Sequence, residues 1–130
     1  MQTTIIIIAL SLHILAATFW AGSTFVLART GGKGAEQLLR PQIGAATVAI
    51  LSGAYLGHLL HAGSFETSEK LLAAGAGCAL VAYLAQIWLA IGLRGRSLDE
   101  AAASRMAAGE RLAAILLAIT TVCMAAARYA

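Results

Sequence analysis

The chain has 130 residues, of which 60% are apolar and only 12% carry a charge, and its mean hydropathy is +0.82. This composition excludes an ordinary water-soluble domain, in which about a quarter of the residues are charged. The net charge is only +3, and a basic surface with base-reading side chains does not fit in so apolar a chain. A nucleic-acid-binding protein is therefore excluded as well.

Apolar segments of about 20 residues are long enough to cross a lipid bilayer. Four such segments predict helices at about 5–28, 42–62, 71–93 and 109–128. The first segment is longer than a signal-peptide core of about 7 to 15 residues and has no positive charge before it, so we interpret it as a retained helix. Short connections favour antiparallel neighbours. The sequence predicts an all-α, up-down-up-down transmembrane bundle that forms one domain over residues 1–130.

The distribution of cations predicts how the bundle is oriented in the membrane. Seven of the nine Lys and Arg residues fall in the first and third connections, namely Arg29, Lys33, Arg40, Arg94, Arg96, Arg105 and Arg111. Only Lys70 and Arg128 fall on the other side. Because cytoplasmic loops carry the excess of cations, we predict that both termini are periplasmic.

Three histidines lie within the apolar segments, where an unpaired imidazole is expensive. His13 follows a helical stripe of mostly small residues, which is typical of a face turned toward other helices. His58 and His61 are three residues apart, so both can face one partner. At about 1.5 Å per residue, His13 and His58 differ by only about 4 Å in depth on antiparallel helices. We predict that these two imidazoles are axial ligands of one haem b, with His61 as a further cofactor-binding candidate.

A copper site is the alternative interpretation of the same half of the bundle. Cys78, Cys123 and Met124 fall at similar depth, and thiolate, thioether and imidazole ligands suit Cu(I). The predicted metal ligands are then His13, His58, Cys78, Cys123 and Met124. The sulfur side chains are equally typical of ordinary packing, and two cysteines on helices of unknown rotation do not establish a disulfide.

The other polar residues have simpler interpretations. Gln86 and Thr120 are predicted to hydrogen-bond between helices. Asp99, Glu100 and Glu110 lie among arginines in the third connection and are predicted to be solvated or salt-bridged surface charges.

The first segment also carries an H-x6-W-x-G pattern, formed by His13, Trp20 and Gly22. This pattern resembles the first helix of two related groups of membrane proteins, the copper-resistance protein D (CopD) family and the four-helix protoporphyrinogen IX oxidase family (HemJ type). The oxidase group is haem-associated; its first-helix His corresponds to His13, and the Lys that opens its third helix resembles Lys70. That group has a His after the Tyr of its third helix, where this chain has Leu84. The resemblance implies a bacterial inner-membrane protein that handles haem or copper.

Three classes of function are consistent with these features. The favoured class is a haem b-binding electron-transfer protein or oxidoreductase, with a redox protein or a quinone as partner. The second class is a copper-binding or copper-transport protein. The third is an accessory subunit of a membrane complex, or a homo-oligomer, that packs through its small-residue faces.

Overall fold

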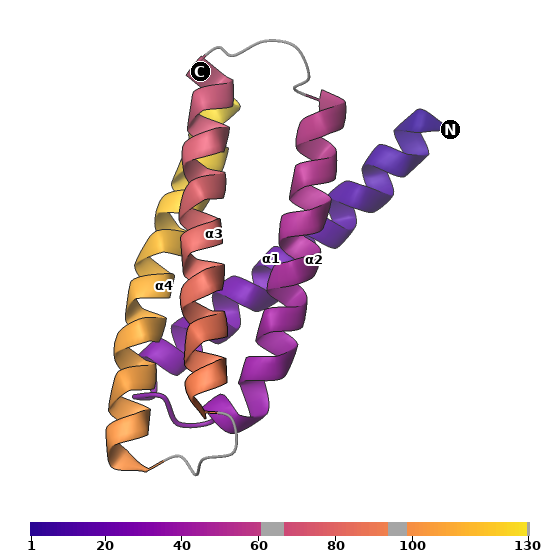
Figure 1. Ribbon diagram of the computed structural model, residues 1–130. Coiled ribbons are helices and arrows are strands. Elements are labelled where there is room, and N and C mark those ends of the chain that lie inside the picture. Colours follow the sequence, from indigo (N-terminus) through magenta and orange to yellow (C-terminus); the bar gives the residue numbers. More distant parts are fainter. Residues whose placement is uncertain (61–66, 94–98, 130) are drawn as a thin grey trace.

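The computed structural model describes residues 1–60, 67–93 and 99–129, and this part of the chain is almost entirely helical. Its four helices are α1 (Gln2–Arg29), α2 (Ala35–Leu60), α3 (Thr67–Leu93) and α4 (Glu100–Ala127). Figure 1 shows them running alternately up and down, with both chain ends at the same end of the bundle. The predicted all-α four-helix bundle is confirmed.

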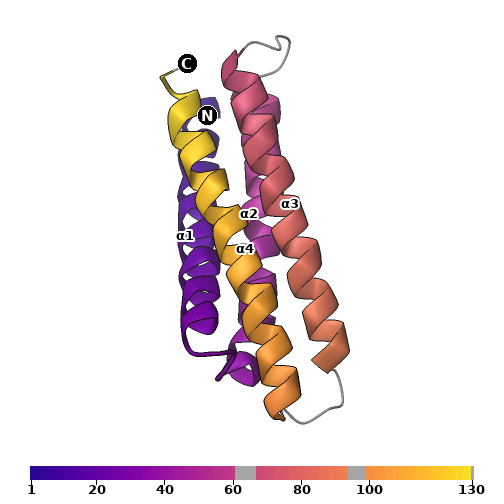
Figure 2. The same cartoon turned by 90° about the vertical axis from the view of Figure 1, so that its left-hand side faces the viewer.

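Each described helix is long and apolar enough to cross a membrane. Large apolar side chains cover the outside of the bundle, as Leu15, Trp88 and Val122 illustrate, because lipid rather than water is their solvent. The chain is therefore a multi-pass membrane protein. In Figures 1 and 2, α3 and α4 run close together, and Figure 1 shows α1 inclined to them, with its N-terminal end apart.

The helices extend beyond the apolar segments at the end of the bundle away from the termini. The second helix begins at Ala35 rather than 42 and includes Pro41, and α4 begins at Glu100 rather than 109. Asp99 caps α4, because its side chain accepts a hydrogen bond of 2.7 Å from the backbone N–H of Ala102. Hydropathy marks the part of a helix that lies in lipid, whereas capping residues and the following turns decide where the helix ends.

Small residues form the centre of the bundle. A buried cluster contains Ala46 and Ala49 of α2, Ala79 and Ala82 of α3, and Ala113 of α4, together with Trp20 and Leu117. Small side chains let helix backbones approach closely, and packing of this kind replaces the hydrophobic effect between helices in lipid.

The connection between α1 and α2 depends on one glycine that packs against α4. Gly32 has a φ of +84°, and a Cβ atom there would lie 2.6 Å from the carbonyl oxygen of Ala103. Gly31 also has a positive φ, +70°, but its Cβ position is open. We expect Gly31→Ala to cost about 1 to 2 kcal/mol from backbone strain, and Gly32→Ala to cost about 1 to 3 kcal/mol more because the helix end must move.

Thermal unfolding in detergent measures this difference, and Gly31→Ala serves as the matched control. Equal melting temperatures for the two variants would contradict the packing of Gly32 on α4.

Candidate functional site

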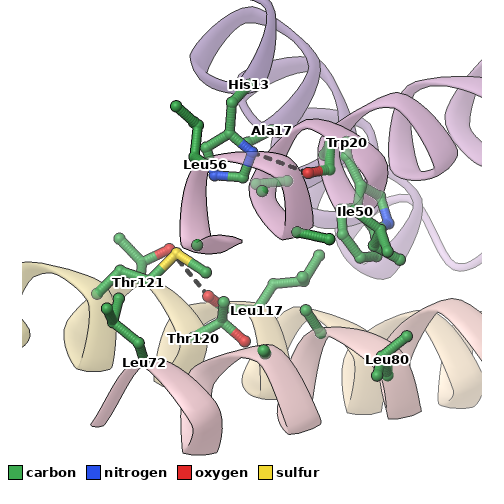
Figure 3. Close-up of a pocket in the computed structure, with 18 of the residues that line it drawn as sticks. His13, Ala17, Trp20, Ile50, Leu56, Leu72, Leu80, Leu117, Thr120 and Thr121 are labelled. Atoms are coloured by element: carbon green, nitrogen blue, oxygen red, sulfur yellow. Dashed lines mark hydrogen bonds between the residues drawn. The ribbon is translucent and has the colours of Figure 1, made fainter. Parts of the chain in front are cut away.

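A cavity of about 520 Å³ lies between the α1–α2 pair and the α3–α4 pair. Figure 3 shows His13, Trp20 and Leu56 on one wall and Leu72, Leu117 and Thr120 across from them. On α2, α3 and α4 its lining comes from the half of the helix nearest the chain termini, the half in which the sequence predicted a cofactor, and on α1 it extends past the middle of the helix to Ala21. Almost all lining side chains are apolar, and the polar ones among the described residues are His13, Trp20, Thr120 and Thr121.

His13 is held against α2 by one nitrogen of its ring. Its Nδ1 lies 2.8 Å from the carbonyl oxygen of Ala49 and 3.3 Å from Oγ of Ser52. A carbonyl oxygen can only accept a hydrogen bond, so Nδ1 carries the proton and donates it. In the neutral ring, Nε2 then has a free lone pair, and no described residue is hydrogen-bonded to it. The ring lines the cavity (Figure 3), so Nε2 is a candidate ligand atom.

Gly53 of α2 leaves the space that the imidazole ring of His13 occupies. A Cβ atom at Gly53 would lie 2.9 Å from Cε1 of His13, closer than real side chains pack. Gly57, one turn further along α2, also lines the cavity, but its Cβ position is open. The absence of a side chain at Gly53 is therefore what lets the ring of His13 reach its hydrogen bond with Ala49.

The other predicted histidine ligands are not on the cavity wall. His58 is exposed and is not among the residues that line the cavity. His61 lies outside the described residues. The structure thus does not bring His58 together with His13 across the cavity.

Of the predicted sulfur ligands, Met124 lines the cavity together with His13. Cys78 and Cys123 are partly buried free thiols outside the lining. Cys123 instead packs against α3, where a Cβ at Gly75 would lie 3.2 Å from its Cβ. Among the described residues, no three His, Cys, Asp or Glu side chains gather closely enough to hold a metal ion.

One sequence prediction is wrong. Glu110 is not a surface charge but is fully buried inside the bundle, where its carboxyl accepts hydrogen bonds from Gln86 (3.0 Å) and Gln42 (3.4 Å). The helical spacing of the sequence indicates this burial. Glu110 lies on the same stripe of α4 as Met106 and Leu117, and all three residues are buried. The expected interhelical bonding of Gln86 is confirmed.

Thr120 behaves as predicted, because its hydroxyl donates to the carbonyl oxygen of Gly75 on α3 at 2.9 Å.

Comparison with protein-family models, with curated proteins and with solved structures finds no match to this chain. The resemblance to the CopD and HemJ groups therefore stays a prediction. The function is therefore inferred from the residues that line the cavity.

Proposed function

We propose that the chain is a membrane haem b-binding protein that transfers electrons, with His13 as an axial ligand. The observation that carries this proposal is the hydrogen bond from Nδ1 of His13 to the carbonyl oxygen of Ala49 at 2.8 Å. Histidines that bind metals characteristically donate their other ring N–H to a carbonyl or carboxylate, which fixes the tautomer and the ring orientation. The arrangement of His13 has this form.

The shape and chemistry of the cavity fit an apolar macrocycle. Sites for organic ligands have volumes of about 300 to 1,000 Å³ and mostly apolar linings with few polar groups. The cavity of about 520 Å³ falls in this range. Its lining includes Gly57, Ala73 and Ala76, whose side chains are absent or small, and this leaves room for a flat ring.

Met124 is the better candidate than His58 for a second axial ligand. It lines the same cavity as His13, whereas His58 is exposed outside it. Haem held by one His and one Met is a known ligation that raises the reduction potential.

Bound haem would supply one-electron chemistry through its iron. The residues of this chain would orient it through His13, keep water away with their apolar side chains, and so tune the potential by burial.

Copper binding is the second candidate, and one observation favours it. His13 and Met124 share the cavity, and imidazole with thioether suits Cu(I). The lining nevertheless offers an ion just these two described ligand side chains, because both cysteines lie outside it. The mainly apolar lining favours an organic cofactor over a bare ion.

An absorption spectrum of the detergent-purified protein, expressed with haem supplied, tests the proposal. We expect a Soret band, and sharp α and β bands after reduction with dithionite. Metal analysis of the same sample separates the alternatives. A colourless protein with about one copper ion per chain would establish the copper candidate, and a colourless protein without metal would favour an accessory subunit.

The choice of second ligand leads to a separate prediction. We expect Met124→Leu, which nearly preserves the side-chain volume, to convert low-spin bands to high-spin bands and to lower the reduction potential, because the iron loses its sixth ligand. The exposed His58→Ala is the control and is expected to leave the spectrum unchanged. The opposite pattern, with bands altered only in His58→Ala, would instead support ligation by His13 and His58.

We also propose that the protein resides in a bacterial inner membrane with both termini in the periplasm. The support is the excess of cations at the end of the bundle away from the termini, where Lys33 lies in the connection between α1 and α2 and Arg29 and Arg40 lie in the adjoining helix ends. Arg94 and Arg96 lie outside the described residues.

A further inference from the structure

A second polar site lies in the half of the bundle away from the termini, and each described helix contributes to it. We call it the glutamate cluster; it consists of Thr24 of α1, Gln42 of α2, Gln86 of α3 and Glu110 of α4. All four side chains are fully buried. Gln86 Nε2 donates to Oε2 of Glu110 at 3.0 Å and to Oγ1 of Thr24 at 2.9 Å. No buried side-chain polar atom of the described chain lacks a hydrogen-bond partner.

The carboxyl of Glu110 has no cationic partner in the described chain. The charged residues of the adjoining helix segments are exposed and do not bond to it, namely Arg29, Glu36, Arg40, Arg105 and Arg111. On α3 the titratable neighbour is Tyr83, whose hydroxyl is bonded to Thr47 instead, at 2.7 Å. A buried carboxylate without a counter-ion is expensive, so a buried ionisable group in a membrane domain points to a function.

The amide of Gln42 fits the glutamate cluster in two orientations, and the first suits a carboxylate. With the amide turned so that Nε2 faces Glu110, Nε2 donates to Oε1 of Glu110 at 3.1 Å. The Gln42 oxygen then accepts from the hydroxyl of Thr24 at 3.0 Å. Both carboxylate oxygens receive an amide N–H, one from Gln42 and one from Gln86.

The second orientation suits a carboxylic acid. Turning the amide by about 180° exchanges its O and N atoms. The amide oxygen of Gln42 then lies 3.1 Å from Oε1 of Glu110. Two oxygens at this distance attract each other only if a proton lies between them, so Oε1 must carry a proton and donate it. The Nε2 of Gln42 now donates to Oγ1 of Thr24 at 3.0 Å, and the Thr24 hydroxyl donates to the carbonyl oxygen of Trp20 at 2.7 Å.

We propose that the glutamate cluster is a proton-binding site, in which Glu110 takes up and releases one proton while the amide of Gln42 turns between these two orientations. On uptake, a hydronium ion of the bulk solvent gives up one proton and becomes water, Oε1 of Glu110 forms the new O–H bond, and the negative charge of the carboxylate is neutralised; release reverses the step. Both oxygens of the Glu110 carboxyl keep a hydrogen-bond partner in each state, so neither state leaves the buried carboxyl unsatisfied.

The glutamate cluster is also connected to the cavity. Trp20 lines the cavity, and its Nε1–H donates to Oε1 of Gln86 at 2.6 Å, while Gln86 donates to Glu110. An occupant that moves the ring of Trp20 would therefore move the amide that holds Glu110. The proton site itself is independent of haem and goes beyond the proposed function.

Infrared difference spectroscopy of the purified full chain, recorded during a pH titration without added haem, tests this proposal. We expect a protonated-carboxyl C=O band that appears and disappears reversibly and shifts in D₂O. It should be lost in Glu110→Gln and kept in Glu100→Gln, the control on an exposed carboxyl of the same helix. The side-chain amide band of Gln42, identified by its loss in Gln42→Met, should shift at the same pH.

Two results would overturn the proposal. One is a set of titrating carboxyl bands that is identical in wild type and in folded Glu110→Gln. The other is a Glu110 signal that stays wholly acid or wholly carboxylate over the pH range in which the protein is folded. If Glu110→Gln does not fold, the wild-type titration and the Gln42→Met band still decide the matter, since a fixed Gln42 amide band would exclude the switch.

Discussion

Replacing His13 by alanine is expected to abolish haem binding. The variant loses the iron–nitrogen bond, and no other described histidine lines the cavity. Loss of an outer partner of a ligand costs about 10- to 100-fold in affinity, so loss of the ligand itself should cost more than about 100-fold. Haem titration of the apo-protein, followed at the Soret band, measures the effect. Undiminished binding by His13→Ala would exclude His13 as an axial ligand.

A methyl group at Gly53 tests the same geometry without removing the imidazole. The new Cβ would lie 2.9 Å from Cε1 of His13, so the ring must give up its hydrogen bond with Ala49. We expect Gly53→Ala to lower haem affinity by about 10- to 100-fold, the usual cost of losing an orienting partner. Gly57→Ala is the matched control, because it also adds a methyl group to the cavity lining of α2 but meets open space. Equal affinities for the two variants would contradict the proposed role of the Ala49 hydrogen bond.

The second large effect is expected at Glu110, and it concerns stability. Glu110→Leu would leave the amide N–H groups of Gln42 and Gln86 without their carboxyl acceptor in a fully buried site. Each unsatisfied buried donor costs about 1 to 3 kcal/mol, which predicts a loss of about 2 to 6 kcal/mol in the free energy of unfolding. Unfolding of the detergent-solubilised protein, followed by circular dichroism, measures this loss.

Glu110→Gln is the control for that experiment. A glutamine has a similar shape, accepts from Gln86 through its oxygen and donates to Gln42 through its nitrogen, so the cost should stay below about 1 kcal/mol. If Glu110→Leu were as stable as Glu110→Gln, the hydrogen bonds of the glutamate cluster would contribute nothing to stability. A stable Glu110→Gln that has lost the titrating band would separate proton binding from folding.

The fold was predictable because its determinants are local in the sequence. A long apolar segment must form a helix in lipid to pair its own backbone groups, and this requirement holds whatever the neighbouring helices do. Hydropathy predicts the starts of α2 and α4 seven and nine residues too late, because it detects the lipid-embedded part of a helix and not, for α4, the cap at Asp99. His13 was identifiable since an imidazole in an apolar segment is itself a signal.

The sequence by itself thus determined the membrane-spanning bundle and identified His13 as a candidate site residue. Only the tertiary structure decided which polar groups meet, because that depends on the rotation of each helix about its axis and on the tilt of α1. Those angles leave His58 exposed outside the cavity and bring Met124 to its wall. They also bury Glu110 among amides from two other helices, since packing of small residues sets helix rotations and leaves just one side of each helix facing its neighbours.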